Sequence, residues 1–193
     1  MAPVAWASWA EELPYRPSRV LVAGTSGSGN STLARRIATA LNAPYTELDA
    51  LHHGPAWEPR PDFVDAVTRL SAAEGWTAEW QYEIARPILG PRADLLVFLD
   101  LPRWLVMTRV VRRTLRRRLG RVELWNGNFE PPLRTVFSDR DHIVRWAWRT
   151  HHEAVDRVME LVDQRPDIPV VRLQTARQVD RWLAGPLARA ARS

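Results

Sequence analysis

Residues 19–41 read RVLVAGTSGSGNSTLARRIATAL, and three segments follow one another within this stretch. Residues 19–23 are apolar after Arg19, which predicts a short buried strand. Leu33, Ile37 and Leu41 recur at helical spacing, which predicts a helix over 31–41. The intervening loop is rich in glycine and serine and runs Gly24, Thr25, Ser26, Gly27, Ser28, Gly29, Asn30, Ser31, Thr32, its last two residues opening the helix.

The loop matches the phosphate-binding pattern G-x-x-x-x-G-K-[ST] at every fixed position except the lysine, where Asn30 stands. Glycines let backbone N–H groups converge on phosphate oxygens, and the helix that follows directs its positive N-terminal end there. Ser31 occupies the position of a magnesium ligand. Residues 24–32 are therefore the candidate nucleotide-binding residues, with ATP and Mg²⁺ as the expected cofactors.

Asn30 at the lysine position is expected to affect the rate of phosphoryl transfer more than the binding of a nucleotide. Lysine at this position reaches the β- and γ-phosphates, whereas asparagine is shorter and neutral. Losing one preorganised donor costs about 10²–10³-fold in rate. Three explanations stay open: a substitution made to disable an enzyme, a natural pseudo-enzyme, or a natural change compensated by an arginine.

The rest of the chain repeats the alternation of strand and helix. Further strands are expected at 45–48, 75–79, 95–99 and 170–173, and further helices at 61–73, 82–89, 102–119, 141–162 and 176–183. Such alternation predicts an α/β fold with a parallel sheet covered on both faces and ligands at the carboxyl ends of the strands. Residues 1–18 are interpreted as an extension that covers an edge of one domain spanning 19–193.

The composition narrows the class of protein. No apolar stretch approaches the roughly 20 residues that span a bilayer, so a membrane protein is not expected. The chain has no cysteine, which excludes disulfides and thiolate metal sites and suits a reducing compartment. A cytoplasmic location is the simplest interpretation.

All 27 basic residues are arginine, and the net charge is +5. Residues 103–150 hold twelve arginines and four acidic residues, so the net charge of this segment, +8, exceeds that of the whole chain. Because arginine presents a planar fork to phosphate or carboxylate, the segment is prepared for anionic partners.

The chain resembles the P-loop kinases of the adenylate-kinase-like group, and within it the DNA topology modulation proteins or small AAA-type ATPases. The resemblance rests on the loop together with ELDALHH at 47–53, GWTAEWQY at 75–82 and FLDLPRW at 98–104. It implies a P-loop NTPase three-layer sandwich with a five-stranded parallel sheet in the order 2-3-1-4-5. It also implies an arginine-rich helical lid, at about 103–150, and transfer of a phosphoryl group from ATP to a nucleotide or small-molecule acceptor. Trp80 departs from the glycine that is usual after the acidic residue of the third strand, and is expected to reshape the acceptor pocket.

Three acidic residues stand at expected strand ends. Asp49 follows the second strand and is the first choice for general base, with a turn-forming role as the alternative. Glu79 ends the third strand and could serve the magnesium ion, and Asp100, after the fourth strand, competes for that role or caps the next helix. His52 and His53 lack a third residue at metal spacing.

The helix after Asp100 carries a row of arginines spaced by four residues: Arg109, Arg113, Arg117 and Arg121. Like charges on one helix face repel, so the row favours a nearby anion. By resemblance to lid arginines, Arg113 and Arg117 are assigned to the transferred phosphoryl group, and Arg109 and Arg113 to the nucleotide. Interleaved Trp125, Trp146 and Trp148 leave a nucleic-acid-binding ATPase as an alternative. Residues 125–130 are a further candidate, with Glu130 and the amides reading an acceptor or forming a plain turn.

Overall fold

The sheet is parallel and has the predicted order. The computed structural model describes residues 8–120, 123, 124, 126, 128, 148 and 152–192. In this part of the chain, five strands pair in the order β2-β3-β1-β4-β5. They are β1 Arg19–Gly24, β2 Tyr45–Thr46, β3 Trp76–Glu79, β4 Leu95–Leu99 and β5 Val170–Leu173. β1 pairs with both β3 and β4, so the loop that follows β1 lies at the centre of the carboxyl edge.

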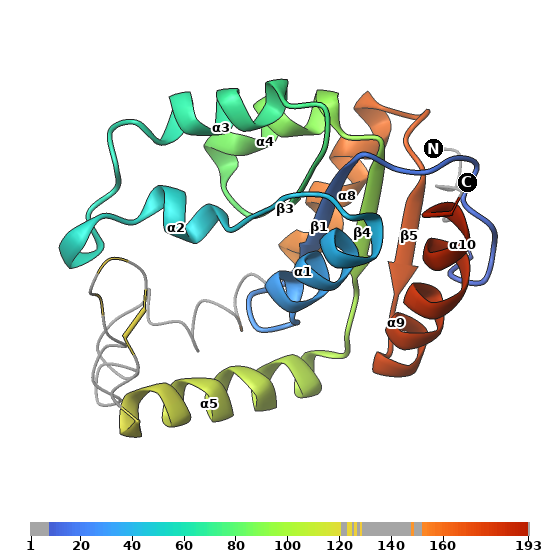
Figure 1. Ribbon diagram of the computed structural model, residues 1–193. Coiled ribbons are helices and arrows are strands. Elements are labelled where there is room, and N and C mark those ends of the chain that lie inside the picture. Colours follow the sequence, from blue (N-terminus) through green and yellow to red (C-terminus); the bar gives the residue numbers. More distant parts are fainter. Residues whose placement is uncertain are drawn as a thin grey trace.

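Helices cover both faces of the sheet and complete a three-layer α/β sandwich (Figure 1). One face is covered by α3 (Phe63–Ala72), α4 (Arg86–Leu89) and α8 (Glu153–Gln164). The other face is covered by α1 (Asn30–Leu41) and by α9 (Ala176–Trp182), which continues through a π-helical turn, Leu183–Leu187, into α10 (Ala188–Ala190). The central strands β1 and β4 are buried on both faces, as their apolar sequences require.

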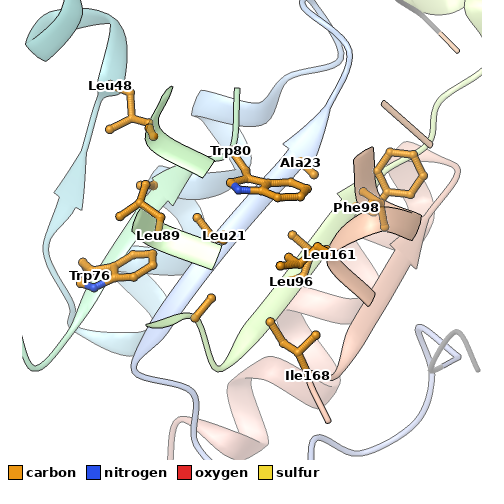
Figure 2. Packing of buried hydrophobic residues seen from close by; sticks show 14 of the residues in the cluster. Leu21, Ala23, Leu48, Trp76, Trp80, Leu89, Leu96, Phe98, Leu161 and Ile168 are labelled. Atoms are coloured by element: carbon orange, nitrogen blue, oxygen red, sulfur yellow. The ribbon is translucent and has the colours of Figure 1, made fainter. Parts of the chain in front are cut away.

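Apolar packing on the α3, α4 and α8 side includes two tryptophans from β3 and its end (Figure 2). Trp76 is fully buried, and Trp80 lies across β1 beside Ala23 with 7% of its surface exposed. The indole at position 80 therefore belongs to the core of the sandwich.

The elements expected at 45–48 and 82–89 differ from those observed. β2 ends at Thr46, and the short helix α2 (Leu48–His52) begins where the strand was expected to continue. Leu48 is fully buried in α2. A buried leucine suits the end of a strand as well as a short helix, so the apolar pattern could not separate the two. Asp49 consequently lies in the first turn of α2 and does not end a strand. The helix expected at 82–89 is a 3₁₀ turn, Glu83–Ala85, followed by α4.

α5 (Arg103–Leu119) lies along the bottom of Figure 1, below the carboxyl ends of the strands. Of the helix expected at 141–162, α8 covers the part from Glu153 onward, and residues 141–147 and 149–151 lie outside the described residues. None of the described helices combines the length and apolarity that crossing a bilayer requires.

Candidate functional site

The glycine-serine loop has the backbone that its glycines allow. Gly27 (φ +87°) and Gly29 (φ +108°) both lie in the left-handed region, where a side chain would be strained. Gly29 is the N-cap of α1, so the first turn of the helix points its N–H groups at the concave side of the loop. The loop follows β1 at the centre of the sheet, where ligands of parallel α/β folds bind.

The side chain of Asn30 is turned back into the loop. Its Nδ2 donates to the Gly24 carbonyl at 3.0 Å, and its Oδ1 accepts from the Ser28 hydroxyl at 2.8 Å. A Cβ at position 24 would stand 2.5 Å from Asn30 Oδ1, so the glycine makes room for the amide. Asn30 therefore braces the loop and does not extend from it as a lysine would.

Ser31 and Glu79 come together beside the loop. Glu79 is 1% exposed and lies next to β1 through the pairing of β3. Its carboxylate accepts a 2.6 Å bond from the Tyr45 hydroxyl and is also hydrogen-bonded to Ser31. Burial raises the pKa of Glu79 above its ordinary value, and the bonds from Tyr45 and Ser31 oppose this rise. A hydroxyl and a carboxylate are ligands that Mg²⁺ prefers, so this pair fits the ion.

Asp49 lies in a polar cluster that joins α2 to the end of β3. Asp49 Oδ1 accepts from Gln81 Nε2 at 2.6 Å and from the Tyr82 hydroxyl at 2.5 Å. The same hydroxyl lies 3.1 Å from Nε2 of His53. Burial, followed by the charge and hydrogen bond of Asp49, raises the pKa of Tyr82. The carboxylate is thus held in place by neutral donors, as a positioned base requires.

Asp100 is engaged elsewhere. Arg172 donates from both Nε, at 2.8 Å, and Nη2 to Asp100 Oδ2, and Gln174 Nε2 lies 3.2 Å from the same oxygen. The N-terminus of α5 has no side-chain cap, so Asp100 does not cap that helix. Asp100 joins the ends of β4 and β5, and Glu79 is the acidic residue that lies with Ser31.

α5 packs directly against the loop. A Cβ at position 27 would lie 2.1 Å from Cγ2 of Val110, so Gly27 allows the loop and the helix to touch. One residue earlier, Arg109 Nη1 donates to the carbonyl of Ser28 at 2.8 Å.

Arg113 and Arg117 are half-buried, as Arg109 is. Arg121 lies outside the described residues, as do Trp125, Trp146 and Glu130. Trp148 is 56% exposed and stacks on the Arg103 guanidinium.

Asn126 and Asn128 reach the segment after α2, a contact that sequence reasoning missed. Asn128 is buried; it accepts from Trp57 N at 3.0 Å and donates to Gly54 O at 2.9 Å. Asn126 donates to the carbonyl of His53. The sequence indicated a polar asparagine-glycine turn but not the partner segment, which lies 71 to 74 residues earlier in the chain. Tyr45, Gln81 and Tyr82 were also missed, although the last two follow a strand whose carboxyl end was expected at the site.

The described residues contain no group of three or more histidine and acidic side chains arranged to hold a metal ion. The oxygen pair of Ser31 and Glu79 has the chemistry to hold a magnesium ion together with phosphate oxygens, if the loop binds them.

No family model matches the chain, and no curated protein matches it. Among solved structures it is similar to a gluconokinase from Sinorhizobium meliloti 1021, with 25% identity and a TM-score of 0.53 over 92% of this chain and 95% of that one. A shikimate kinase from Bacteroides thetaiotaomicron has 13% identity and a TM-score of 0.46 over 87% of this chain and 95% of that one. A sugar kinase from Janibacter sp. HTCC2649 has 19% identity and a TM-score of 0.44 over 89% of this chain and 98% of that one. The first of these, with the sheet order and the loop, identifies the fold as that of the P-loop kinases.

Proposed function

We propose that this chain binds ATP with Mg²⁺ and transfers the γ-phosphoryl group to a hydroxyl of a small polyhydroxy acceptor. The observation that carries the proposal is that Glu79 lies beside β1 and next to Ser31, at the glycine-serine loop, because a hydroxyl and a carboxylate there would both be available to a magnesium ion. The similarity to a gluconokinase supports a kinase reaction and favours sugar acids as the first acceptors to test. The narrower resemblance to DNA topology modulation proteins stays a prediction, as does a cytoplasmic location.

Each group has a defined task in this proposal. Backbone N–H groups of the loop and of the first turn of α1 bind the phosphates, and Ser31 and Glu79 hold the metal. When bound, the magnesium ion neutralises negative charge on the phosphates. Asp49 accepts the proton of the acceptor hydroxyl, and Tyr82 and Gln81 hold its carboxylate in one orientation. Arg113 and Arg117 remain assigned to the transferred phosphoryl group as a prediction.

Asn30 limits the rate that this arrangement reaches. Its amide is neutral, so it brings no positive charge to the phosphates. The amide is also already hydrogen-bonded to Gly24 and Ser28. The alternative function is therefore an NTP-binding protein with little turnover, which would keep the loop, Ser31 and Glu79 but not the chemistry.

The test compares the parent chain with Asn30→Lys and Asp49→Asn. Binding of Mg²⁺-ATP is measured by calorimetry. ADP formation is measured in a separate assay with gluconate, other sugar acids, polyols and nucleosides as acceptors. We expect binding by all three chains, and acceptor-dependent ADP formation that Asn30→Lys raises by at most about 10²–10³-fold, the full cost of one missing preorganised donor. Asp49→Asn should abolish that ADP formation while nucleotide binding persists.

Three outcomes redirect the proposal. Binding without acceptor-dependent ADP formation, even by Asn30→Lys, would support the NTP-binding protein. Absence of nucleotide binding by every chain would refute the assignment of the loop. Binding of oligonucleotides that weakens with salt and is lost in Arg113→Gln/Arg117→Gln would support the nucleic-acid-binding ATPase.

A further inference from the structure

A P-loop without lysine lacks the positive charge of that residue, and an arginine of another element, α5, contacts the loop. Asn30 is 9% exposed and both ends of its amide are bonded within the loop. No lysine occurs in the chain, so a replacement cation has to be an arginine. The described arginine that is hydrogen-bonded to the loop, Arg109, belongs to α5.

Arg109 is fixed at the loop by two contacts. Its Nη1 donates to the carbonyl of Ser28 at 2.8 Å and stands 3.8 Å from the point where a Cβ on Gly29 would lie. The neighbouring Val110 packs against Gly27, which holds α5 in register with the loop. The bond to Ser28 uses one of five N–H donors of the guanidinium, so the group can be anchored and still donate to a phosphate.

The charge of Arg109 is not neutralised by a carboxylate in the part of the chain that the structure describes. Other arginines there form ion pairs, among them Arg172 with Asp100 and Arg36 with Asp180. Arg113 follows Arg109 by four residues and Arg117 by eight, which places their backbones about 6 Å and 12 Å further along the helix. Among the described arginines of the row, Arg109 is therefore the one with a hydrogen bond to the loop backbone.

We propose that Arg109 supplies from α5 the positive charge that other P-loops take from their lysine, by donating to the phosphate chain of the bound nucleotide. The inference rests on the proposed function, since it requires that the loop binds a nucleotide. It also selects among the explanations of Asn30: the residue braces the loop, and the charge comes from a neighbouring helix. Arg109 then acts on the phosphates and not on the base.

A double-mutant cycle tests this assignment by equilibrium binding, without any turnover. The chains are the parent, Arg109→Gln, Asn30→Lys and the double variant, and Arg112→Gln is the matched control, because Arg112 is exposed on the same helix. The probes are inorganic triphosphate with Mg²⁺, which has no base, and adenosine, which has no phosphate. Calorimetry gives the dissociation constants.

We expect Arg109→Gln to weaken triphosphate binding by about 10–100-fold, the loss of one or two hydrogen bonds from a charged donor. In the Asn30→Lys background the same change should cost much less, because the lysine restores the charge. Adenosine binding should be unchanged in all chains, and Arg112→Gln should bind triphosphate as the parent does. Arg109→Lys, which keeps the charge, should recover part of the affinity that Arg109→Gln loses.

Several results would overturn the assignment. They are an equal loss in both backgrounds, a loss confined to adenosine, no loss at all, or a parent that binds no triphosphate while Asn30→Lys does. The last result leaves the proposed function standing. If neither chain binds triphosphate, the proposed function and this inference fall together. Circular dichroism and thermal unfolding of each variant establish that the chains compared are folded, and failure of Arg109→Lys to recover affinity in a folded chain also counts against a role of the charge.

Discussion

Among single residues, His52 is one whose protonation the fold opposes. Its ring stacks on Tyr82, with centroids 4.2 Å apart, and meets the edge of Phe63. Burial, followed by the charge of His53, lowers the pKa of His52 below its ordinary value of 6.5. A base with a lowered pKa binds its proton less tightly in the folded chain than in the unfolded one. Its contribution to stability is therefore present above about pH 6.5 and is lost as the pH falls through that value.

His52→Phe keeps an aromatic ring on Tyr82 and removes the titration. We expect the parent to lose thermal stability between pH 7.5 and pH 5.5, and His52→Phe to lose less over the same range. Thermal unfolding midpoints measured across this range check the prediction, with His152→Phe, a change at an exposed histidine, as the control. An unchanged slope in His52→Phe would assign the pH dependence to other groups.

Single residues differ in how far sequence could place them. The loop pattern specified the position of Ser31. Glu79 was expected near it because it ends a strand that lies beside the strand before the loop. The partners of Asp49 could not be predicted, since they depend on the turn of α2 that brings position 49 against Tyr82. The inward orientation of Asn30 also needed the structure, because an amide at that position can bond either the loop or a ligand.

Between elements, α5 can contact the loop because position 27 is a glycine and has no Cβ. Gly27→Ala would place a Cβ 2.1 Å from Val110 Cγ2 at a residue whose φ is +87°. Overpacking and the strained backbone together should cost about 2–4 kcal/mol of stability. Nucleotide binding should weaken as well, because the loop has to move away from α5.

Val110→Ala separates these two costs. It removes the Cγ2 atom that collides with the new methyl group, so Gly27→Ala should cost less in the Val110→Ala background, by the part due to overpacking. Denaturant unfolding of the four chains gives this coupling. Gly185→Ala is the control, since its added Cβ would meet nothing closer than 3.5 Å and its φ is not positive. Strict additivity would show that backbone strain alone makes position 27 a glycine.

Whole elements were more predictable than their ends. Alternating strands and helices predicted a parallel sheet, because each apolar run has to be covered on both faces, and the family resemblance implied the order of the strands. The end of the last helix was not predicted: residues 183–187 continue it through Gly185 and Pro186, which usually stop a helix. A π-helical turn accommodates the proline there, and the apolar side chains of Leu183 and Leu187 remain buried.

Across the whole molecule, the N-terminal segment and the C-terminal helix lie side by side, away from the candidate site (Figure 1). Trp9 and Leu13 pack against the core on the α1 and α9 side. Arg16 donates to the carbonyls of Leu41 and Ala191 at 2.8 and 2.9 Å, and Glu12 pairs with Arg189. The exposed ion pair adds little to stability, so the apolar contacts and the hydrogen bonds of Arg16 account for most of the stability that the N-terminal segment contributes.

Deleting residues 1–17 should therefore lower stability and leave the site intact. Ser18 is retained because its carbonyl accepts from Trp76 at the start of β3. Loss of the Arg16 bonds alone costs about 1–3 kcal/mol, which lowers the melting temperature by about 2–12 °C in a chain of this size. Triphosphate affinity, measured well below the melting temperature, should match that of the full chain, because the segment contacts the amino ends of β1 and β4 and the loop lies at the carboxyl ends. Deletion of residues 1–7 is the control, since it keeps each of these contacts. A truncated chain that melts with the parent, or that loses triphosphate affinity while still folded, would contradict this separation of the stabilising segment from the site.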